Sequence, residues 1–243
     1  MIKLKNCLCL KAALIVSIVF LTGCQGTYYA TMEALGQHKR DILMERIAKT
    51  SQCQGKAQKQ FQSLLENISD IKDFQDGNIV SKYNTLNSEY RKSLVKARDV
   101  DKRIKEVEEV AKLFFREWED ELEVYGNEKL RRSSEQQLDR RRTRCLEVIH
   151  AMKSAESKID PALLKMGDYV LFLKHNINAH TIASLDEELG VVKDNIALVV
   201  ETMGSSIAEA NKFVDEMDDA SQGKEVLQEQ VAEKTENKEI VDK

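Results

Sequence analysis

One apolar repeat constrains the fold of this chain more than any other feature. Over residues 79–125, apolar or small side chains recur about every 3.5 residues, which is the heptad spacing of a coiled-coil seam. They are Ile79, Tyr83, Leu86, Tyr90, Leu94, Ala97, Val100, Ile104, Val107, Ala111, Phe114, Trp118, Leu122 and Tyr125. A strand would alternate every second residue, so this segment is predicted to be one helix, roughly 70 Å long, that packs along other helices.

Three further segments carry helical stripes. Residues 28–74 form the first, and 185–217 form the last with a spacing again near 3.5 residues. The third follows the turn at Gly126-Asn127, runs to about 159, and has its stripe at Leu130, Leu138, Cys145, Val148, Ile149, Met152 and Ile159. The stripe of 28–74 is interrupted at 49–60. That interruption indicates either a seam of small residues where two helices approach closely or a stretch that faces a partner.

The connections between these segments contain turn residues. Asp76-Gly77-Asn78 and Gly126-Asn127 are turn sequences, and a glycine readily takes a positive φ at a helix C-terminus. Ser184 opens a capping box for the last helix. Asp160 is predicted to be an N-cap before Pro161, which indicates a kink after which the helix continues.

Short connections favour antiparallel neighbours. The predicted fold is therefore all-α, an elongated antiparallel helical bundle or coiled coil of about four long helices. Within it, Leu163–Ala179 is the most apolar stretch after the start of the chain. It is predicted to be a buried bundle segment, and the alternative is a docking face for a partner helix or a second copy of the chain.

The C-terminal part of the chain differs from the rest. From Asp215 onward, ten acidic residues face four lysines, and large apolar residues are few. Such a composition buries too little apolar surface to offset the entropy of ordering, so 219–243 is predicted to be a disordered acidic tail. The helical bundle domain is then predicted to span 24–218.

The first 23 residues have the features of a secretion signal. Lys3, Lys5 and Lys11 precede an apolar run that is too short to span a bilayer, which takes roughly 20 residues. The run ends in Leu21-Thr22-Gly23-Cys24, which resembles the lipobox of bacterial lipoproteins at every position. That resemblance implies cleavage before Cys24, acylation (palmitate) of Cys24, and a protein held at a membrane by its lipid. Gln25, where lipoproteins retained in the inner membrane tend to have Asp, implies the periplasmic face of the outer membrane.

Removal of the signal leaves three cysteines, and acylation of Cys24 leaves Cys53 and Cys145 as the two thiols in an oxidising compartment. In the predicted topology they lie on parallel helices with an offset of about six residues, which is about 9 Å of helix rise. A disulfide does not bridge that distance. The two cysteines are therefore predicted to be unpaired.

Three stretches resemble the signatures of a known family. They are Thr27–Leu43, Glu117–Leu122 and Val170–Ala179. They are similar to a family of Gram-negative lipoproteins, the domain-of-unknown-function family 2959, over nearly all of 24–217. The resemblance implies a helical lipoprotein and brings neither an assigned activity nor site residues.

Arginines form the strongest charged cluster. They are Arg131, Arg132, Arg140, Arg141, Arg142 and Arg144. One interpretation is a binding site for anionic lipid headgroups or another envelope polyanion at Arg140, Arg141, Arg142 and Arg144. The other is a solvated helix face whose arginines pair with acids across the hairpin, with Arg131 and Arg132 near Glu119, Glu121 and Glu123, and Arg140–Arg142 near residues 111–113.

No catalytic motif is present after the signal, so the chain is predicted not to be an enzyme and to need no cofactor. His175 and His180 are five residues apart, a poor spacing for a shared metal ion on a helix, so no metal site is predicted. The formal net charge of −4 becomes more negative once the three lysines of the signal are removed, which argues against nucleic acid. The expected function is a structural or protein-interaction role in the cell envelope, with an unknown envelope partner or a second copy. The alternatives are the polyanion-binding module and an enzyme with an unrecognised site.

Overall fold

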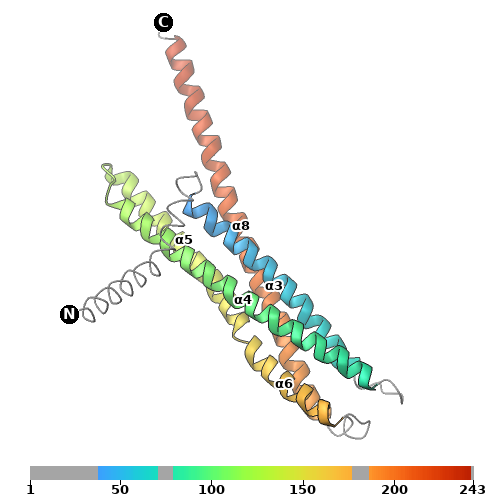
Figure 1. Ribbon diagram of the computed structural model, residues 1–243. Coiled ribbons are helices and arrows are strands. Elements are labelled where there is room, and N and C mark those ends of the chain that lie inside the picture. Colours follow the sequence, from blue (N-terminus) through green and yellow to red (C-terminus); the bar gives the residue numbers. More distant parts are fainter. Residues whose placement is uncertain (1–37, 71–78, 177–185, 242–243) are drawn as a thin grey trace, which may run out of the picture. The chain divides into compact units, whose positions relative to one another are not determined.

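Five helices make up the regular structure of the residues that are described (Figure 1). They are α3 (Lys39–Ser69), α4 (Ile79–Leu122), α5 (Glu128–Glu156), α6 (Ile159–His175) and α8 (Asp186–Val241). This part of the chain contains no strand, and the prediction of an all-α bundle is confirmed.

A computed structural model describes residues 38–70, 79–176 and 186–241, without the side chains of 79, 186 and 218–241. The predicted signal peptide, Cys24, the turn at Gly77 and the capping box at Ser184 lie outside the described residues. The chain divides into one unit of residues 1–42 and another of 43–243, and the packing given below is that of the second unit.

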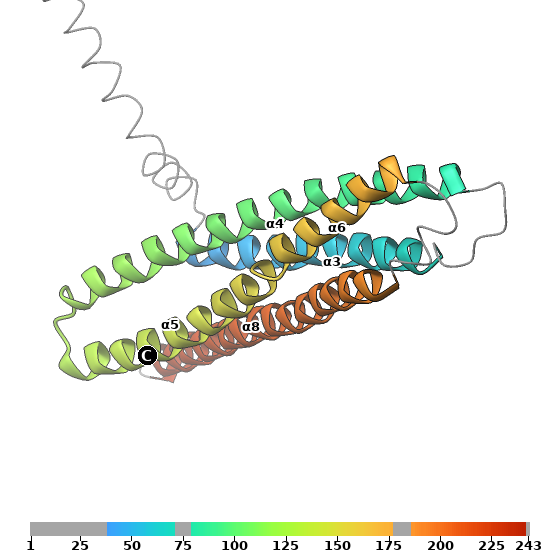
Figure 2. The same cartoon turned by 90° about the horizontal axis from the view of Figure 1, so that it is seen from below.

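The helices fill four positions of a closed bundle, because α5 and α6 share one position. Both α4 and α8 pack against α5 and α6 (Figure 2). α3 completes the bundle through contacts with α4 and α8. Arg46 forms an ion pair of 2.9 Å with Glu106 on α4, and Ser206 on α8 donates a hydrogen bond of 3.0 Å to Gln54. Neighbouring positions are antiparallel, as the short connections predict.

The predicted apolar stripes form much of the core. From α4 the buried members are Leu86, Val100, Ile104, Val107, Ala111 and Phe114, and from α8 they are Leu189, Val192, Ile196, Val199, Met203, Ala210 and Met217. A 3.5-residue repeat keeps one side of each helix toward its neighbours, which is why the sequence locates these residues correctly.

The interrupted stripe at 49–60 faces α8 through small and polar side chains. Thr50, Ser51 and Gln54 are buried, and Gln58 Nε2 donates a hydrogen bond of 2.9 Å to the carbonyl of Val200. A side chain bonded to the backbone of the opposite helix requires a close approach. The structure therefore supports the interpretation of a small-residue seam.

The α4–α5 connection depends on a side-chain cap. Asn127 has an extended backbone, and its Oδ1 accepts hydrogen bonds from the amides of Lys129 and Leu130 at 3.0 and 3.2 Å. This satisfies two of the amides that a helix start leaves without partners. Gly126 does not take the positive φ that we expected of it, because Asn127 makes the turn instead.

The kink predicted near Pro161 is confirmed, but its cap is not the predicted one. Lys158 occupies the N-cap position of α6 without a side-chain hydrogen bond, and Asp160 lies inside the first turn. Pro161 has no N–H to offer the carbonyl of Ser157, four residues earlier, so the ladder of the continuous helix breaks at this point. The break separates α5 from α6 and redirects the chain.

The apolar stretch Leu163–Ala179 is only partly buried. Leu163, Met166, Tyr169, Val170 and Leu173 face the bundle, as predicted. Leu164, Leu171 and Phe172 face outward, with 69%, 57% and 40% of their surface exposed. The three last residues of the stretch lie outside the described residues.

Cys53 and Cys145 are both free, as predicted. Their separation is larger than the sequence indicates. Cys53 lies near Asp99 of α4, whereas Arg142, just before Cys145, contacts Phe115 of the same helix. Those two levels of α4 are about 24 Å apart along the helix.

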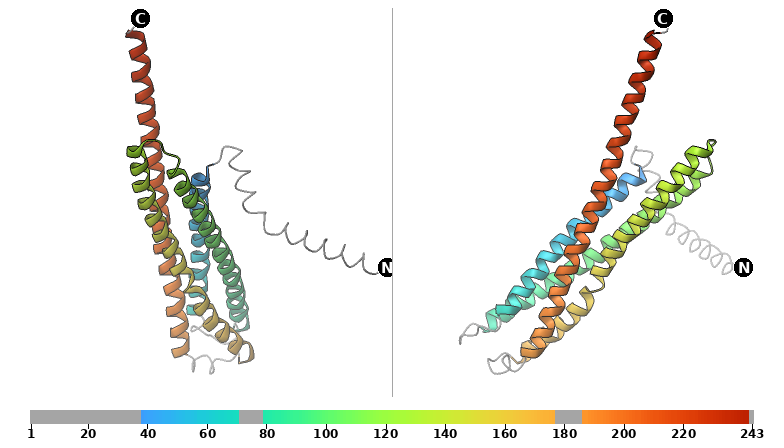
Figure 3. Two further views of the ribbon diagram at one scale, coloured as in Figure 1. Left: turned by 90° about the vertical axis from the view of Figure 1, so that its left-hand side faces the viewer. Right: turned by 180° about the vertical axis from the view of Figure 1, so that it is seen from behind.

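The backbone of α8 remains helical from the packed bundle to Val241, and its last part extends past the turn between α4 and α5 (Figure 3). A helix without tertiary packing is only marginally stable in water. This geometry is compatible with the disorder that the acidic composition predicts, and disorder of 219–243 stays a prediction.

Candidate functional site

The α4–α5 hairpin carries the candidate residues of the sequence. The arginine cluster, defined as Arg140, Arg141, Arg142 and Arg144, lies on α5. The structure shows what each of these side chains contacts.

Arg144 joins α5 to α8. Its guanidinium lies 2.8 Å from Glu209 and 3.2 Å from Glu216, both on α8, and 3.1 Å from Glu147 on its own helix. Partial burial acts to lower the pKa of Arg144, and the hydrogen bonds that its guanidinium donates to the three carboxylates outweigh this effect and raise the pKa. This arginine therefore stays charged and is held by three acids.

Arg142 joins α5 to α4. It donates to Glu119 at 2.5 Å and to the carbonyl of Phe115 at 3.1 Å, and its guanidinium carbon lies 5.4 Å from the centre of the Phe115 ring. The hydrogen bond from Arg142 lowers the pKa of the Glu119 carboxyl. The sequence did not predict Phe115 and Glu119 as partners of Arg142. It placed Arg140–Arg142 beside residues 111–113 of α4, whereas Arg142 contacts residues of α4 that lie closer to the turn.

Arg141 contacts a sulfur atom and an aromatic ring, among other partners. It lies 3.1 Å from the sulfur of Met217 and 5.9 Å from the centre of the Trp118 ring, a cation–π distance. Arg140 is exposed to solvent. Three members of the arginine cluster thus bind other parts of the bundle, and an anion would have to compete with these contacts. Binding of a polyanion to the cluster stays a prediction.

Arg131 and Arg132 do not pair across the hairpin as predicted. Both bind Glu128 of their own helix, at 2.9 and 2.7 Å, and Arg131 also lies 3.5 Å from Glu135. Neighbours three or four residues apart on a helix meet on one face. These local pairs replace the predicted pairs with Glu119, Glu121 and Glu123.

The turn of the hairpin exposes apolar side chains. We call Val124, Tyr125 and Leu130 the hairpin tip, and their exposed fractions are 82%, 41% and 56%. The sequence repeat placed Tyr125 and Leu130 in the seam, and that prediction is wrong. The contacts given above with α3 and α8, at Glu106 and Arg141, lie further from the turn, and near the turn α4 and α5 by themselves do not cover every apolar residue of their stripes. The polar partner here is Ser134, which accepts a hydrogen bond of 2.8 Å from Trp118 Nε1.

A second surface feature is a groove at the α5–α6 kink, with a volume of about 890 Å³. Its walls are formed by Tyr90, Leu94, Ala97, Arg98, Asp101 and Lys105 of α4 and by Glu156, Ile159, Asp160, Pro161, Leu163 and Leu164. Burial raises the pKa of Glu156, and the nearby carboxylates of Asp101 and Asp160 raise it further. Lys105 binds Asp101 at 2.8 Å.

The described residues contain neither a cluster of metal ligands nor a helix that could span a membrane. No three His, Cys, Asp or Glu side chains converge there in a way that could hold a metal ion. None of the helices in this part of the chain is both long and apolar enough to cross a membrane.

Comparison with known proteins places the chain without giving it an activity. The profile of a family described as a protein of unknown function (DUF2959) matches residues 28–217. No curated protein matches the chain. The matched range contains the arginine cluster, the hairpin tip and the groove at the kink.

Proposed function

Since the chain belongs to the DUF2959 family, which brings no assigned activity, we propose a function from its own residues. The protein is a lipoprotein of the bacterial envelope, anchored by acyl chains on Cys24, and its helical bundle binds another envelope component without catalysing a reaction. The observation that carries this proposal is Leu21-Thr22-Gly23-Cys24 after a basic start and an apolar run. A thiol at this place accepts lipid, and two acyl chains give stable anchoring.

The bundle supports a binding role in two ways. Polar side chains of the interior join α3 to α8, since Ser206 donates to Gln54 and Ser51 donates to Asn211, and these bonds serve packing. In addition, α4 has 44 residues and spans about 66 Å, which lets a membrane-anchored chain contact a partner some distance into the periplasm. That partner is another envelope protein or a second copy, which mass measurement of the soluble chain distinguishes.

Replacement of the proposed lipid acceptor tests the anchoring. In cells fed an acyl-chain analogue, Cys24→Ser should lose the label and move from the membrane fraction to the soluble fraction. Cys53→Ser is the matched control, and it should keep the acyl label and stay in the membrane fraction. Retention of Cys24→Ser in the membrane with full labelling would remove the lipoprotein proposal.

Gln25 provides a test of location. An outer-membrane lipoprotein with Gln25→Asp should be retained in the inner membrane, because lipoproteins with Asp at this place tend to stay there. An unchanged distribution in density-separated membranes would contradict the proposed outer-membrane location.

Binding of an envelope polyanion is the second candidate function. Exposure of Arg140 beside three bound arginines favours it. Arg140→Glu disturbs no contact given above, so it should reduce binding to anionic liposomes without loss of stability. Reversal of Arg140, Arg141 and Arg142 together should abolish that binding, and unchanged binding of both variants would exclude a lipid site.

A further inference from the structure

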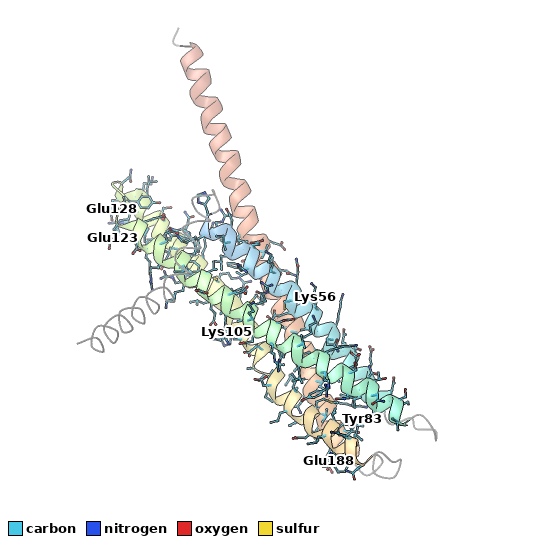
Figure 4. The ribbon with its side chains drawn as sticks, viewed as in Figure 1. Lys56, Tyr83, Lys105, Glu123, Glu128 and Glu188 are labelled. Carbon is cyan, nitrogen blue, oxygen red and sulfur yellow. The ribbon has the colours of Figure 1, made fainter. Side chains whose placement is uncertain are left out.

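The turn of the α4–α5 hairpin lies at one end of the bundle, past the contacts with α3 and α8 that are given above. On the α3 side, Arg46 pairs with Glu106, and the hairpin tip follows about 24 Å further along α4. On the α8 side, Met217 contacts Arg141 and is the last residue of α8 whose side chain is described. From Arg141 back to the start of α5 beside the tip is about 20 Å along the helix. Figure 4 shows Glu123 and Glu128 at this end and Tyr83 and Glu188 at the other.

The exposed surface at this end is apolar and nearly neutral. Val124, Tyr125 and Leu130 are its apolar members, with Val124 82% exposed. The charged residues around them nearly balance: Asp120, Glu121, Glu123 and Glu128 against Lys129, Arg131 and Arg132. A tyrosine beside exposed aliphatic side chains suits the interface of a bilayer, where a ring with one polar end is favoured.

The proposed anchor leaves the bundle from the same end. Leu43 is the first residue of the bundle unit and lies one turn before Arg46 on α3. The chain between Cys24 and Lys39, where α3 begins, has a maximal reach of roughly 50 Å, which exceeds the distance by which the tip extends past Leu43. The tip is therefore within reach of the membrane that holds the lipid.

We propose that the hairpin tip rests on the lipid surface in which Cys24 is anchored, so that the membrane holds the bundle at two points. This inference rests on the proposed lipidation of Cys24. Three apolar side chains bind a bilayer weakly by themselves, but a tether raises their effective concentration at the surface. Contact at two points directs the other end of the bundle, where the start of α4, the end of α6 and the start of α8 lie, away from the membrane.

The course of α8 sets a condition on this arrangement. As a straight helix to Val241, α8 runs past the tip (Figure 3). Contact of the tip with a bilayer requires the residues after Met217 to leave that course, in agreement with the disorder that their composition predicts.

An environment-sensitive fluorophore on a single introduced cysteine tests the proposal. The lipidated full-length protein carries Cys53→Ser, and Val124→Cys provides the label position at the tip. Val80→Cys is the matched control, because Val80 is 58% exposed and lies in the first turn of α4, at the opposite end. Cys145 is buried and stays unlabelled, which the parent without an introduced cysteine verifies. The probe surface is a vesicle of phosphatidylethanolamine and phosphatidylglycerol.

On vesicles, the label at 124 should shift its emission to the blue and become several-fold less accessible to a water-soluble quencher, while lipid-borne quenchers reduce its emission. The label at 80 should show none of these changes. Equal, water-like behaviour of both labels on protein that floats with the vesicles would overturn the tip contact and leave the anchor intact. Shielding of 124 in cell envelopes but not on protein-free vesicles would also overturn it, since the tip would then contact a protein. Failure of the protein to float at all would refute the lipidation of Cys24 instead.

Discussion

Gly167 of α6 offers a sharp test of the packing between α4 and α6. A Cβ at this position would lie 2.6 Å from the hydroxyl oxygen of Tyr90 and 3.3 Å from Cζ of the same ring. Contacts of this length force the tyrosine or the helix to move. Gly190 of α8 is the matched control, because a Cβ there meets nothing within 4 Å.

The magnitudes follow from two opposing effects. Replacing a helical glycine by alanine stabilises a helix by about 0.5–1 kcal/mol, and overpacking costs about 1–3 kcal/mol. Gly190→Ala should therefore raise the free energy of unfolding by up to about 1 kcal/mol. Gly167→Ala should leave it unchanged or lower it by about 2 kcal/mol.

A double-mutant cycle separates the contact from the helix propensity. Tyr90→Phe removes the atom at 2.6 Å, so Gly167→Ala in that background should recover most of the stabilisation seen at Gly190. Urea unfolding followed by far-UV circular dichroism measures each free energy, provided that the denaturant dependence stays constant. If Gly167→Ala stabilises the protein as much as Gly190→Ala does, with or without Tyr90, the close contact does not exist in solution.

Three further predictions follow from single side chains. Ser206→Ala should lower the free energy of unfolding by about 1–3 kcal/mol, because it leaves a buried glutamine oxygen without its donor, and Ser205→Ala on the exposed face should change it by less than about 0.5 kcal/mol in the same assay. Cys145, with a pKa raised to about 12 by burial, should react with a thiol reagent only on unfolding, whereas the half-buried Cys53 reacts first in the native protein; equal rates in a time course would contradict the burial of Cys145. Hydrogen bonds from Arg131 and Arg132 lower the pKa of Glu128 to about 2, so the stabilisation from this carboxylate is present above pH 4.5 and is lost as the pH falls toward 2. Glu128→Gln should therefore reduce the loss of melting temperature on the acid side of a pH profile. A profile identical to that of the unchanged protein would refute the pairing.

The sequence predicts the candidate residues of the α4–α5 hairpin better than it predicts their partners. The arginines of α5 are recognisable as a cluster from composition alone, and pairing with acids was one of the two interpretations. The sequence does not assign the acids correctly: Glu119, expected to pair with Arg131 and Arg132, pairs with Arg142 instead. A shift of a few residues in hairpin register exchanges one partner for another, and the register depends on where Asn127 caps α5.

By itself, the sequence determined the helical fold, much of the buried stripes of α4 and α8, and the kink near Pro161. Each of these follows from local chemistry: a 3.5-residue repeat, residues that cap or turn, and a proline without an N–H. Only the tertiary structure decided that Tyr125 and Leu130 are exposed and that Arg144 is held by acids of α8. Periodicity specifies the side of a helix that faces its neighbours, but not how far those neighbours extend along it. Exposure at the hairpin tip depends on that overlap, which is set by the lengths and the register of all the helices together.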